Sequence, residues 1–387
     1  MNNRAPALAA EMVQALRERS GLQRDEVADA FLAVPRHVFV PGAPLAEVYR
    51  YDAVIPTHFG ADGLSTSSSS APNIMATMLE QVDVAPGMHV LEIGAGTGYN
   101  AGLLAHLAGP DGAVLSLDLD TTIVAEAREH LARASIANAR VECADGWLGA
   151  PGDAPFDRII ATVGVWEISP HWLAQLRPGG VLVAPLWLRA GAQVSVAFVR
   201  EGEELRSTSM CACGFMRLRG PNQGRDAHVV VPGWRGRVDT PTAREWVASF
   251  EGATPERLEL LRTLLRTPPD VTAVPRPPAG WTFRLALDEP DTIELTSRTG
   301  RRHHAMGVFS ARDPSVAVFE AGRVVAFGAP AGADRLRAAL TGMRPLRIED
   351  LDIRAVPHPA RATGDAWLLE RPHLDLVVRE GPHRTRP

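Results

Sequence analysis

Hydrophobic positions between residues 88 and 188 change their period several times along the chain. Apolar runs of strand length cover 89–93, 113–118, 139–144, 156–162 and 180–187. Segments with helical spacing separate several of them, at 98–108, 121–134 and 170–176. Because strands that alternate with helices form a parallel sheet with helices on both faces, this region predicts an α/β fold.

The flanking segments extend this prediction in both directions. Helical spacing indicates helices over residues 5–19 and 25–33, and again from Pro72 to about residue 81. Pro72 suits the first turn of a helix, where its missing N–H is not needed. Apolar alternation after the last strand predicts further strands at 192–200 and 204–215.

The chain of 387 residues is longer than one hydrophobic core usually spans. A polar, turn-rich joint covers 219–226, and five prolines between 268 and 278 suit a semi-rigid connector. Further strand-like and helical segments follow. We therefore predict a first domain over 1–219 and an α+β accessory domain over 220–387, with peptide recognition as its candidate role.

Composition narrows the function classes. The net charge of −5 does not favour a nucleic-acid partner, and the absence of lysine excludes a lysine nucleophile. The three cysteines do not suffice for a disulfide framework or a zinc site, so we expect reduced thiols, no metal and a cytoplasmic location. No apolar run is long enough for a membrane span. The sequence pattern does not indicate whether the chain is a monomer or an oligomer.

A glycine loop follows the first strand of the alternating region. Glu92 ends the apolar run, and Gly94, Gly96 and Gly98 precede a helix. Glycines at this point let backbone N–H groups approach a ligand, and ligands of open α/β sheets bind beyond the carboxyl ends of the strands. Asp118 ends the second strand, where a carboxylate can accept hydrogen bonds from ribose hydroxyls.

Asp145 and Gly146 follow the third strand, in reach of an adenine edge. The simpler alternative is that the glycines form a turn and Asp118 caps a helix. Three such features in the order of the strand ends favour a nucleoside cofactor.

These residues occur within longer motifs. "VLEIGAGTGY", "LSLDLD" and "CADGWLG" resemble the S-adenosylmethionine-dependent methyltransferases. More narrowly, "VPRHVFVP" (34–41), "SAPNIMA" (70–76), "DGWLG" (145–149) and "QLRPGGVLVAPL" (175–186) resemble the protein-L-isoaspartate O-methyltransferase family in order and spacing. The resemblance covers roughly residues 20–188. It implies a Rossmann-like methyltransferase fold and an enzyme that uses S-adenosylmethionine and releases S-adenosylhomocysteine.

The resemblance also implies roles for single residues. Ser70 corresponds to the family's active-site serine, which hydrogen-bonds the carboxylate that receives the methyl group. Asp118 would bind the ribose. The expected cofactor contacts are completed by Glu92, Gly94, Gly96 and Gly98 at the methionine part and by Asp145 and Gly146 at the adenine. The expected substrate side comprises Ser69, Ala71, Pro72, Val163 and Trp166, although Trp166 could equally be a packing residue.

Departures from the family pattern bear on the substrate. Ser70 lies in a serine-rich run, which by itself could be a flexible solvated loop, and "VGVWEISP" replaces a run of small residues. The long C-terminal extension and "CGFMRLRG" (213–220) resemble methyltransferases that tailor ribosomally made lanthipeptides and graspetides. We therefore expect a carboxyl O-methyltransferase for an aspartyl or isoaspartyl residue of a peptide, which leads to a succinimide, in a tailoring role.

Two alternatives stay open at this point. One is a general repair methyltransferase for isoaspartyl proteins, and the other is a cofactor-binding peptide scaffold without catalysis. A serine hydrolase is disfavoured because Ser70 has no evident His–Asp relay in the sequence. Base N-methylation is disfavoured because "TVGVW" replaces the Asn/Asp-Pro-Pro-aromatic motif typical of those enzymes.

Overall fold

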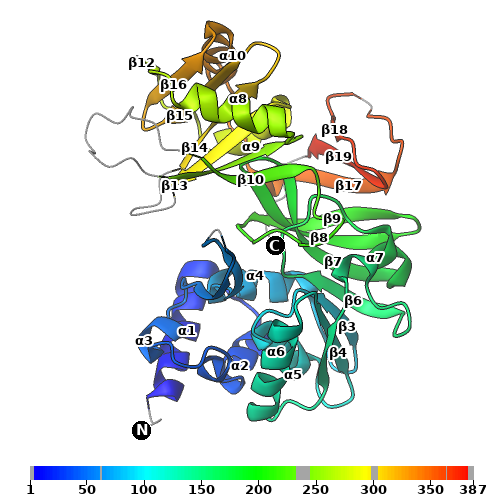
Figure 1. Cartoon of the computed structure of the whole chain (residues 1–387). Coiled ribbons are helices and arrows are strands. Elements are labelled where there is room, and N and C mark those ends of the chain that lie inside the picture. The colour runs from blue at the N-terminus through cyan, green and yellow to red at the C-terminus, as the bar shows by residue number, and fades with distance from the viewer. Residues whose placement is uncertain (1–3, 62, 232–244, 298–303, 363, 382–387) are drawn as a thin grey trace.

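The computed structural model describes residues 4–61, 63–231, 245–297, 304–362 and 364–381. Within these ranges the strands form a ten-stranded sheet, a seven-stranded sheet and a two-stranded hairpin. The parallel strands of the ten-stranded sheet and the N-terminal helices occupy the lower part of Figure 1, and the seven-stranded sheet lies above them. The C-terminal strands of the ten-stranded sheet, in orange and red, lie at the upper right. The described helices include none that is long and apolar enough to cross a bilayer.

One half of the large sheet is parallel, as the alternating pattern predicts. Its strand order is β7-β6-β3-β4-β5, and each neighbouring pair is parallel. The bounds are β3 His89–Ile93, β4 Ala113–Asp118, β5 Ala139–Cys143, β6 Phe156–Ala161 and β7 Leu176–Arg189. The carboxyl ends of β3, β4 and β6 therefore meet at one edge of the sheet.

Helices cover both faces of this parallel half. Successive residues of a strand point to opposite faces, so Val90 packs among the N-terminal helices while Leu91 packs against the other layer. The first layer contains α1 Ala5–Ser20, α2 Asp25–Ala33, α4 Pro72–Val82, α5 Tyr99–Ala108 and α6 Thr121–Arg133, with η1 Arg36–Phe39 and α3 Leu45–Val48 at its margin. The second layer contains η2 Gly146–Leu148 and α7 Pro170–Gln175.

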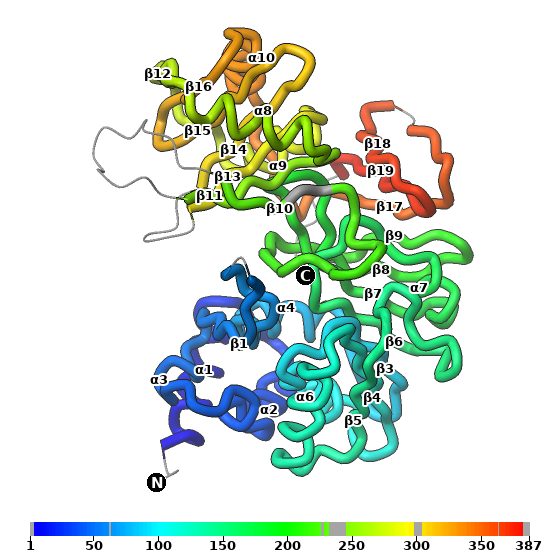
Figure 2. Tube along the Cα trace, in the orientation of Figure 1, coloured from blue at the N-terminus to red at the C-terminus, as the bar shows by residue number. Residues whose placement is uncertain are grey.

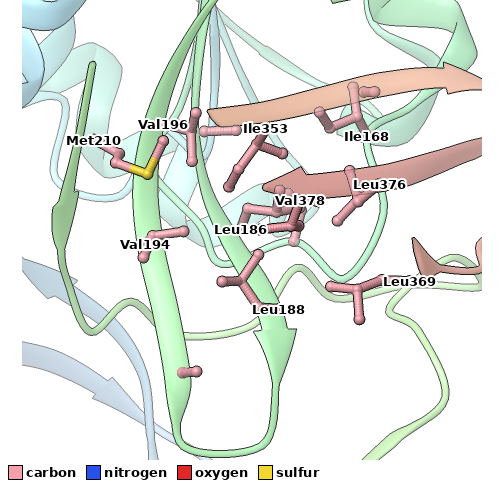
Figure 3. Close-up of a cluster of buried hydrophobic side chains, with 14 of the residues drawn as sticks. Ile168, Leu186, Leu188, Val194, Val196, Met210, Ile353, Leu369, Leu376 and Val378 are labelled. Atoms are coloured by element: carbon pink, nitrogen blue, oxygen red, sulfur yellow. The ribbon is translucent and has the colours of Figure 1, made fainter. Parts of the chain in front are cut away.

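The other half of the sheet is antiparallel and is completed by the C-terminal end of the chain. After β7 the order continues β8-β9-β17-β19-β18. The bounds are β8 Ala192–Glu201, β9 Glu204–Ala212, β17 Leu351–Pro357, β18 Trp367–Leu369 and β19 Leu374–Glu380. Ala355 of β17 pairs with Leu205 of β9. Ile353 and Val378 point into one apolar cluster with Leu186 and Val196 (Figure 3).

The intervening residues form the seven-stranded sheet, which is antiparallel throughout. Helix α8 packs on one face beside Val316 and Val318, while α10 packs on the other beside Ala317. The bounds are β10 Asp226–Val231, β11 Trp246–Glu251, α8 Pro255–Leu265, β12 Asp270–Ala273, α9 Trp281–Asp288, β13 Thr292–Ser297, β14 His304–Ser310, β15 Ser315–Glu320, β16 Arg323–Gly328, α10 Pro330–Leu340 and η3 Ile348–Asp350.

The tertiary structure adds three features to the sequence-based prediction. The serine run forms strand β2 (Ser65–Ser69), which pairs with β1 (Ile55–Phe59), rather than a solvated loop. The proline-rich connector contains β12, an edge strand paired with β16. The trace in Figure 2 passes from the large sheet into the small one and returns, so the strand pairing crosses the predicted boundary at 219/220.

Candidate active site

A cavity of about 310 Å³ lies at the carboxyl ends of β3, β4 and β6. Its lining comes from six stretches of the chain: the β1–β2 hairpin with the start of α4, the glycine loop, the end of β4, Gly146, the end of β6 and the segment 214–219. The volume is in the range of small-molecule pockets. The position agrees with the rule that ligands of open α/β sheets bind beyond the strand ends.

The glycine loop adopts a backbone that favours glycine. Gly94, Gly96 and Gly98 have φ values of 100°, 51° and 83°. A Cβ on Gly94 would lie 2.8 Å from Cγ1 of Val163 and 2.9 Å from Oγ1 of Thr162. Gly94 and Gly96 line the cavity, whereas Gly98 lies beneath it as the N-cap of α5. Close packing against β6 therefore adds to the conformational reason for glycine.

Asp118 lies at the rim of the cavity with its side chain 11% exposed. Its Oδ2 accepts a hydrogen bond from the N–H of Gly96 at 3.2 Å, and its Oδ1 accepts one from the N–H of Asp120 at 3.2 Å. A guanidinium nitrogen of Arg219 lies 3.7 Å from Oδ1. Because a carboxylate has about four lone-pair sites, Asp118 keeps capacity for further hydrogen bonds from a ligand.

Glu92 lies behind the loop and does not line the cavity. Its side chain is fully buried and accepts hydrogen bonds from Nδ2 of Asn100 at 2.8 Å and from Oγ of Ser116 at 2.5 Å. Burial raises the pKa of Glu92 to about 7, against the lowering effect of these two donors and with a smaller contribution from Asp118. Asn100 itself lines the cavity, so Glu92 acts on the site through Asn100.

The two residues predicted to contact the adenine, Asp145 and Gly146, differ in their position relative to the cavity. Gly146 lines the cavity, and a Cβ there would lie 2.6 Å from Cγ2 of Ile93. Asp145 does not line it, and its Oδ1 accepts a hydrogen bond from the N–H of Trp147 at 3.0 Å as the N-cap of η2. The adenine role of Asp145 stays a prediction.

The serine run supplies one wall of the cavity. Ser69, Ser70 and Ala71 line it, and Pro72 begins α4 directly behind them. The side chains of Ser67 and Ser69 are 4% and 2% exposed, and their hydroxyls have no hydrogen-bond partner within the described ranges. Ser70 is half-buried and lines the cavity.

The two predicted substrate residues after β6 lie in different surroundings. Val163 lines the cavity next to the glycine loop. Trp166 is 8% exposed, does not line the cavity and packs against the guanidinium of Arg371 at 4.2 Å from the ring centre. Its placement matches the packing alternative, and a substrate contact stays a prediction without support from this geometry.

The sequence motif at 213–220 was linked to a class of substrate, but its pattern did not predict that residues 214–219 form the remaining wall of the cavity. Its residues pair with the loop after β6: the N–H of Gly164 donates to Met216 O at 2.6 Å, and that of Leu218 donates to Gly164 O at 2.8 Å. Gln193 clamps the same segment, because its Oε1 accepts from the N–H of Phe215 at 2.5 Å. The available sequence signal is the apolar-polar alternation of "MRLR" (216–219), which reaches the predicted domain joint.

The residues present fit a nucleoside cofactor with a charged amino-acid end. One cavity is lined by three kinds of group that suit such a ligand. These are the glycine loop, where a side chain on Gly94 would meet its neighbours, the carboxylate of Asp118, which can accept further hydrogen bonds, and two buried serines whose hydroxyls have no partner within the described ranges. The described residues contain no group of three or more His, Cys, Asp or Glu side chains placed to hold a metal ion.

Comparison with known proteins shows the family of the chain. A sequence profile described as protein-L-isoaspartate(D-aspartate) O-methyltransferase matches residues 7–223. A protein-L-isoaspartate O-methyltransferase of Thermotoga maritima is 40% identical over 166 residues, which are 43% of this chain and 51% of that protein. The Methanopyrus kandleri enzyme of the same name is 34% identical over 210 residues, which are 54% of this chain and 90% of that protein.

A solved structure named protein-L-isoaspartate O-methyltransferase is 26% identical, with a TM-score of 0.54. The match covers 91% of this chain and 97% of that one, so it includes most of the residues after 219. Fold and site thus define a Rossmann-like, S-adenosylmethionine-dependent methyltransferase. Within that class, the chain belongs to the protein-L-isoaspartate(D-aspartate) O-methyltransferase family.

Proposed function

We propose that this chain transfers a methyl group from S-adenosylmethionine to the α-carboxylate of L-isoaspartyl residues in peptides and proteins. The observation that carries this proposal is that Ser70, Asp118 and the glycine loop line the same cavity. Membership of the family supports the acceptor. The methyl ester activates the carbonyl toward attack by the next backbone nitrogen, which closes a succinimide as the ester C–O bond breaks and methanol leaves. Water then opens the succinimide at either carbonyl, which gives aspartate or isoaspartate.

Methyl transfer to a carboxylate requires that the two reactants are aligned and does not require a general base. A carboxylate acceptor is ionised at pH 7, so no proton has to be removed before transfer. The cofactor, when bound, supplies an electrophilic methyl group on a sulfonium. Gly94, Gly96 and Asp118 would hold it, and the Ser70 hydroxyl would donate a hydrogen bond that orients the acceptor. Orientation of two reactants can contribute about 7–11 kcal/mol in favourable cases.

Repair of isoaspartyl sites is supported better than tailoring of a ribosomal peptide. The tailoring hypothesis depended on the long extension after residue 219. The structural match that covers 91% of this chain carries the name of the repair class and spans most of that extension too. The extension therefore does not distinguish the two roles. For residues 220–387 we retain peptide recognition as the proposed contribution.

The test uses the full chain, labelled S-adenosylmethionine and two synthetic peptides that differ only in one isoaspartyl or aspartyl residue. We expect methyl ester on the isoaspartyl peptide and at least a hundredfold lower rate on the aspartyl peptide. Faster methylation of the aspartyl peptide would support the tailoring hypothesis instead. Tight binding of S-adenosylhomocysteine, measured by calorimetry, without methylation of either peptide would support the scaffold alternative.

A further inference from the structure

A buried arginine near the C-terminal end of the chain contacts the backbone behind the active site. The side chain of Arg371 is 2% exposed. Its Nε donates to the carbonyl of Trp166 at 2.8 Å, and one terminal nitrogen donates to the carbonyls of Leu188 at 3.0 Å and Trp187 at 3.3 Å. One guanidinium thus joins the loop after β6 to the end of β7.

Two acidic side chains complete this contact between distant segments. Glu251 of β11 accepts a hydrogen bond from Nε1 of Trp166 at 3.3 Å, and its carboxylate lies 3.9 Å from Arg371. Glu167 accepts hydrogen bonds from the N–H groups of His373 at 2.6 Å and Leu374 at 3.3 Å. The loop that departs from the family pattern is therefore a docking element for residues 371–374.

The same loop forms part of the cavity. Val163 lines the cavity, and the adjacent Gly164 pairs with Met216 and Leu218 of the opposite wall. The N–H of Val165 donates to Pro185 O at 2.8 Å. Two cavity walls thus depend on the position of residues 163–166, whose end is held by Arg371.

We propose that Arg371 is a positioning residue for methyl transfer, which fixes the loop 163–166 and through it the acceptor side of the cavity. This inference rests on the proposed function. A guanidinium presents several N–H donors in a rigid plane, so it can serve carbonyls on two segments at once, whereas an ammonium cannot span them in the same geometry. Without it, buried carbonyls lose their donors and the loop loses its anchor.

The test compares full-length Arg371→Met and Arg371→Lys with a matched control, Arg284→Met. Arg284 of α9 is also buried, with its side chain 6% exposed, but it pairs with Glu380 and lies over Trp367. Four quantities are measured: kcat and KM for an isoaspartyl peptide, the Kd of S-adenosylhomocysteine by calorimetry, and hydrogen exchange of the amides in 163–168.

We expect Arg371→Met to lower kcat/KM at least tenfold, with most of the loss in KM, and to change the Kd of S-adenosylhomocysteine less than threefold. Exchange of the 163–168 amides should accelerate at least tenfold. Arg371→Lys should recover only part of both effects, and Arg284→Met should show neither. If Arg371→Met does not fold, Arg371→Lys, which keeps the charge and the aliphatic stem, decides the question.

Unchanged kinetics and exchange in a folded Arg371 variant would overturn the inference. Equal effects of Arg371→Met and Arg284→Met would also overturn it, because they would indicate general destabilisation. If the wild-type chain methylates no isoaspartyl peptide, the proposed function fails. In that case the exchange measurement still decides whether Arg371 holds the loop.

Discussion

The N–H of Gly96 donates a hydrogen bond to Oδ2 of Asp118 at 3.2 Å, and this contact ties the glycine loop after β3 to the end of β4. The two residues are 22 positions apart in the sequence. Parallel pairing of β3 with β4 brings the ends of both strands to the same edge of the sheet. Asp118 therefore both shapes the loop and presents a carboxylate to the cavity.

Replacement of Asp118 by alanine should weaken cofactor binding. The variant loses an acceptor for ribose hydroxyls and the anchor of the Gly96 N–H, and each charge-assisted hydrogen bond contributes about 1.5–3 kcal/mol. We expect the Kd of S-adenosylhomocysteine, measured by calorimetry, to rise at least tenfold. Asp111→Ala, at an exposed turn after α5, is the control and should bind normally. Equal affinity of both variants would mean that Asp118 does not contact the cofactor.

Ser70→Ala should slow methyl transfer and leave cofactor binding unchanged. Ser70 lines the cavity next to the start of α4, and its hydroxyl is proposed to orient the acceptor carboxylate. Loss of one such hydrogen bond, worth about 1.4 kcal/mol in the transition state, lowers kcat roughly tenfold. The Kd of S-adenosylhomocysteine should stay within twofold of wild type. Turnover at the wild-type rate would remove Ser70 from the proposed mechanism.

Glu92 predicts a pH dependence of stability. Its pKa is raised from 4.5 to about 7 in the folded state. The native state therefore binds more protons than the unfolded chain between these values, and the free energy of unfolding falls as pH rises from about 4.5 to 7. One differential proton corresponds to about 1.4 kcal/mol per pH unit at most.

Glu92→Gln should make the free energy of unfolding less dependent on pH between about 4.5 and 7. Urea unfolding at several pH values measures it, and Glu129→Gln on the exposed side of α6 serves as the control. A decline that is equally steep in Glu92→Gln would assign the pH dependence to other groups.

Gly94→Ala and Gly87→Ala form a matched pair. Both glycines have positive φ, 100° and 82°, but a Cβ on Gly87 meets nothing within 4 Å, whereas one on Gly94 meets Val163 and Thr162. Backbone strain should cost each variant about 1–2 kcal/mol. The steric conflict should cost Gly94→Ala about 1–3 kcal/mol more. Urea unfolding measures both, and equal losses would show that the loop relaxes away from β6.

Local patterns predicted the parallel half of the large sheet and the glycine loop correctly. Hydrophobic period, helix starts such as Pro72 and glycine spacing act over a few residues, so they are visible in one sequence. The same signals favoured a nucleoside cofactor, because the ends of parallel strands gather at one edge, and the family resemblance identified it as S-adenosylmethionine. Glu92 was assigned to the cofactor from its place in the motif. Only the structure shows that its carboxylate is engaged by Asn100 and Ser116.

What the sequence by itself determined is the order of strands and helices along residues 88–188 and, through the family resemblance, the cofactor. Tertiary structure decided where the distant segments go. Antiparallel pairing of Ala355 with Leu205 joins residues 150 positions apart, and such pairing leaves no local pattern. Likewise, Trp166 packs against the guanidinium of Arg371, which lies between the C-terminal strands β18 and β19 and 205 positions away in the sequence. Long-range contacts of this kind are selected by shape and hydrogen-bond complementarity in the folded chain.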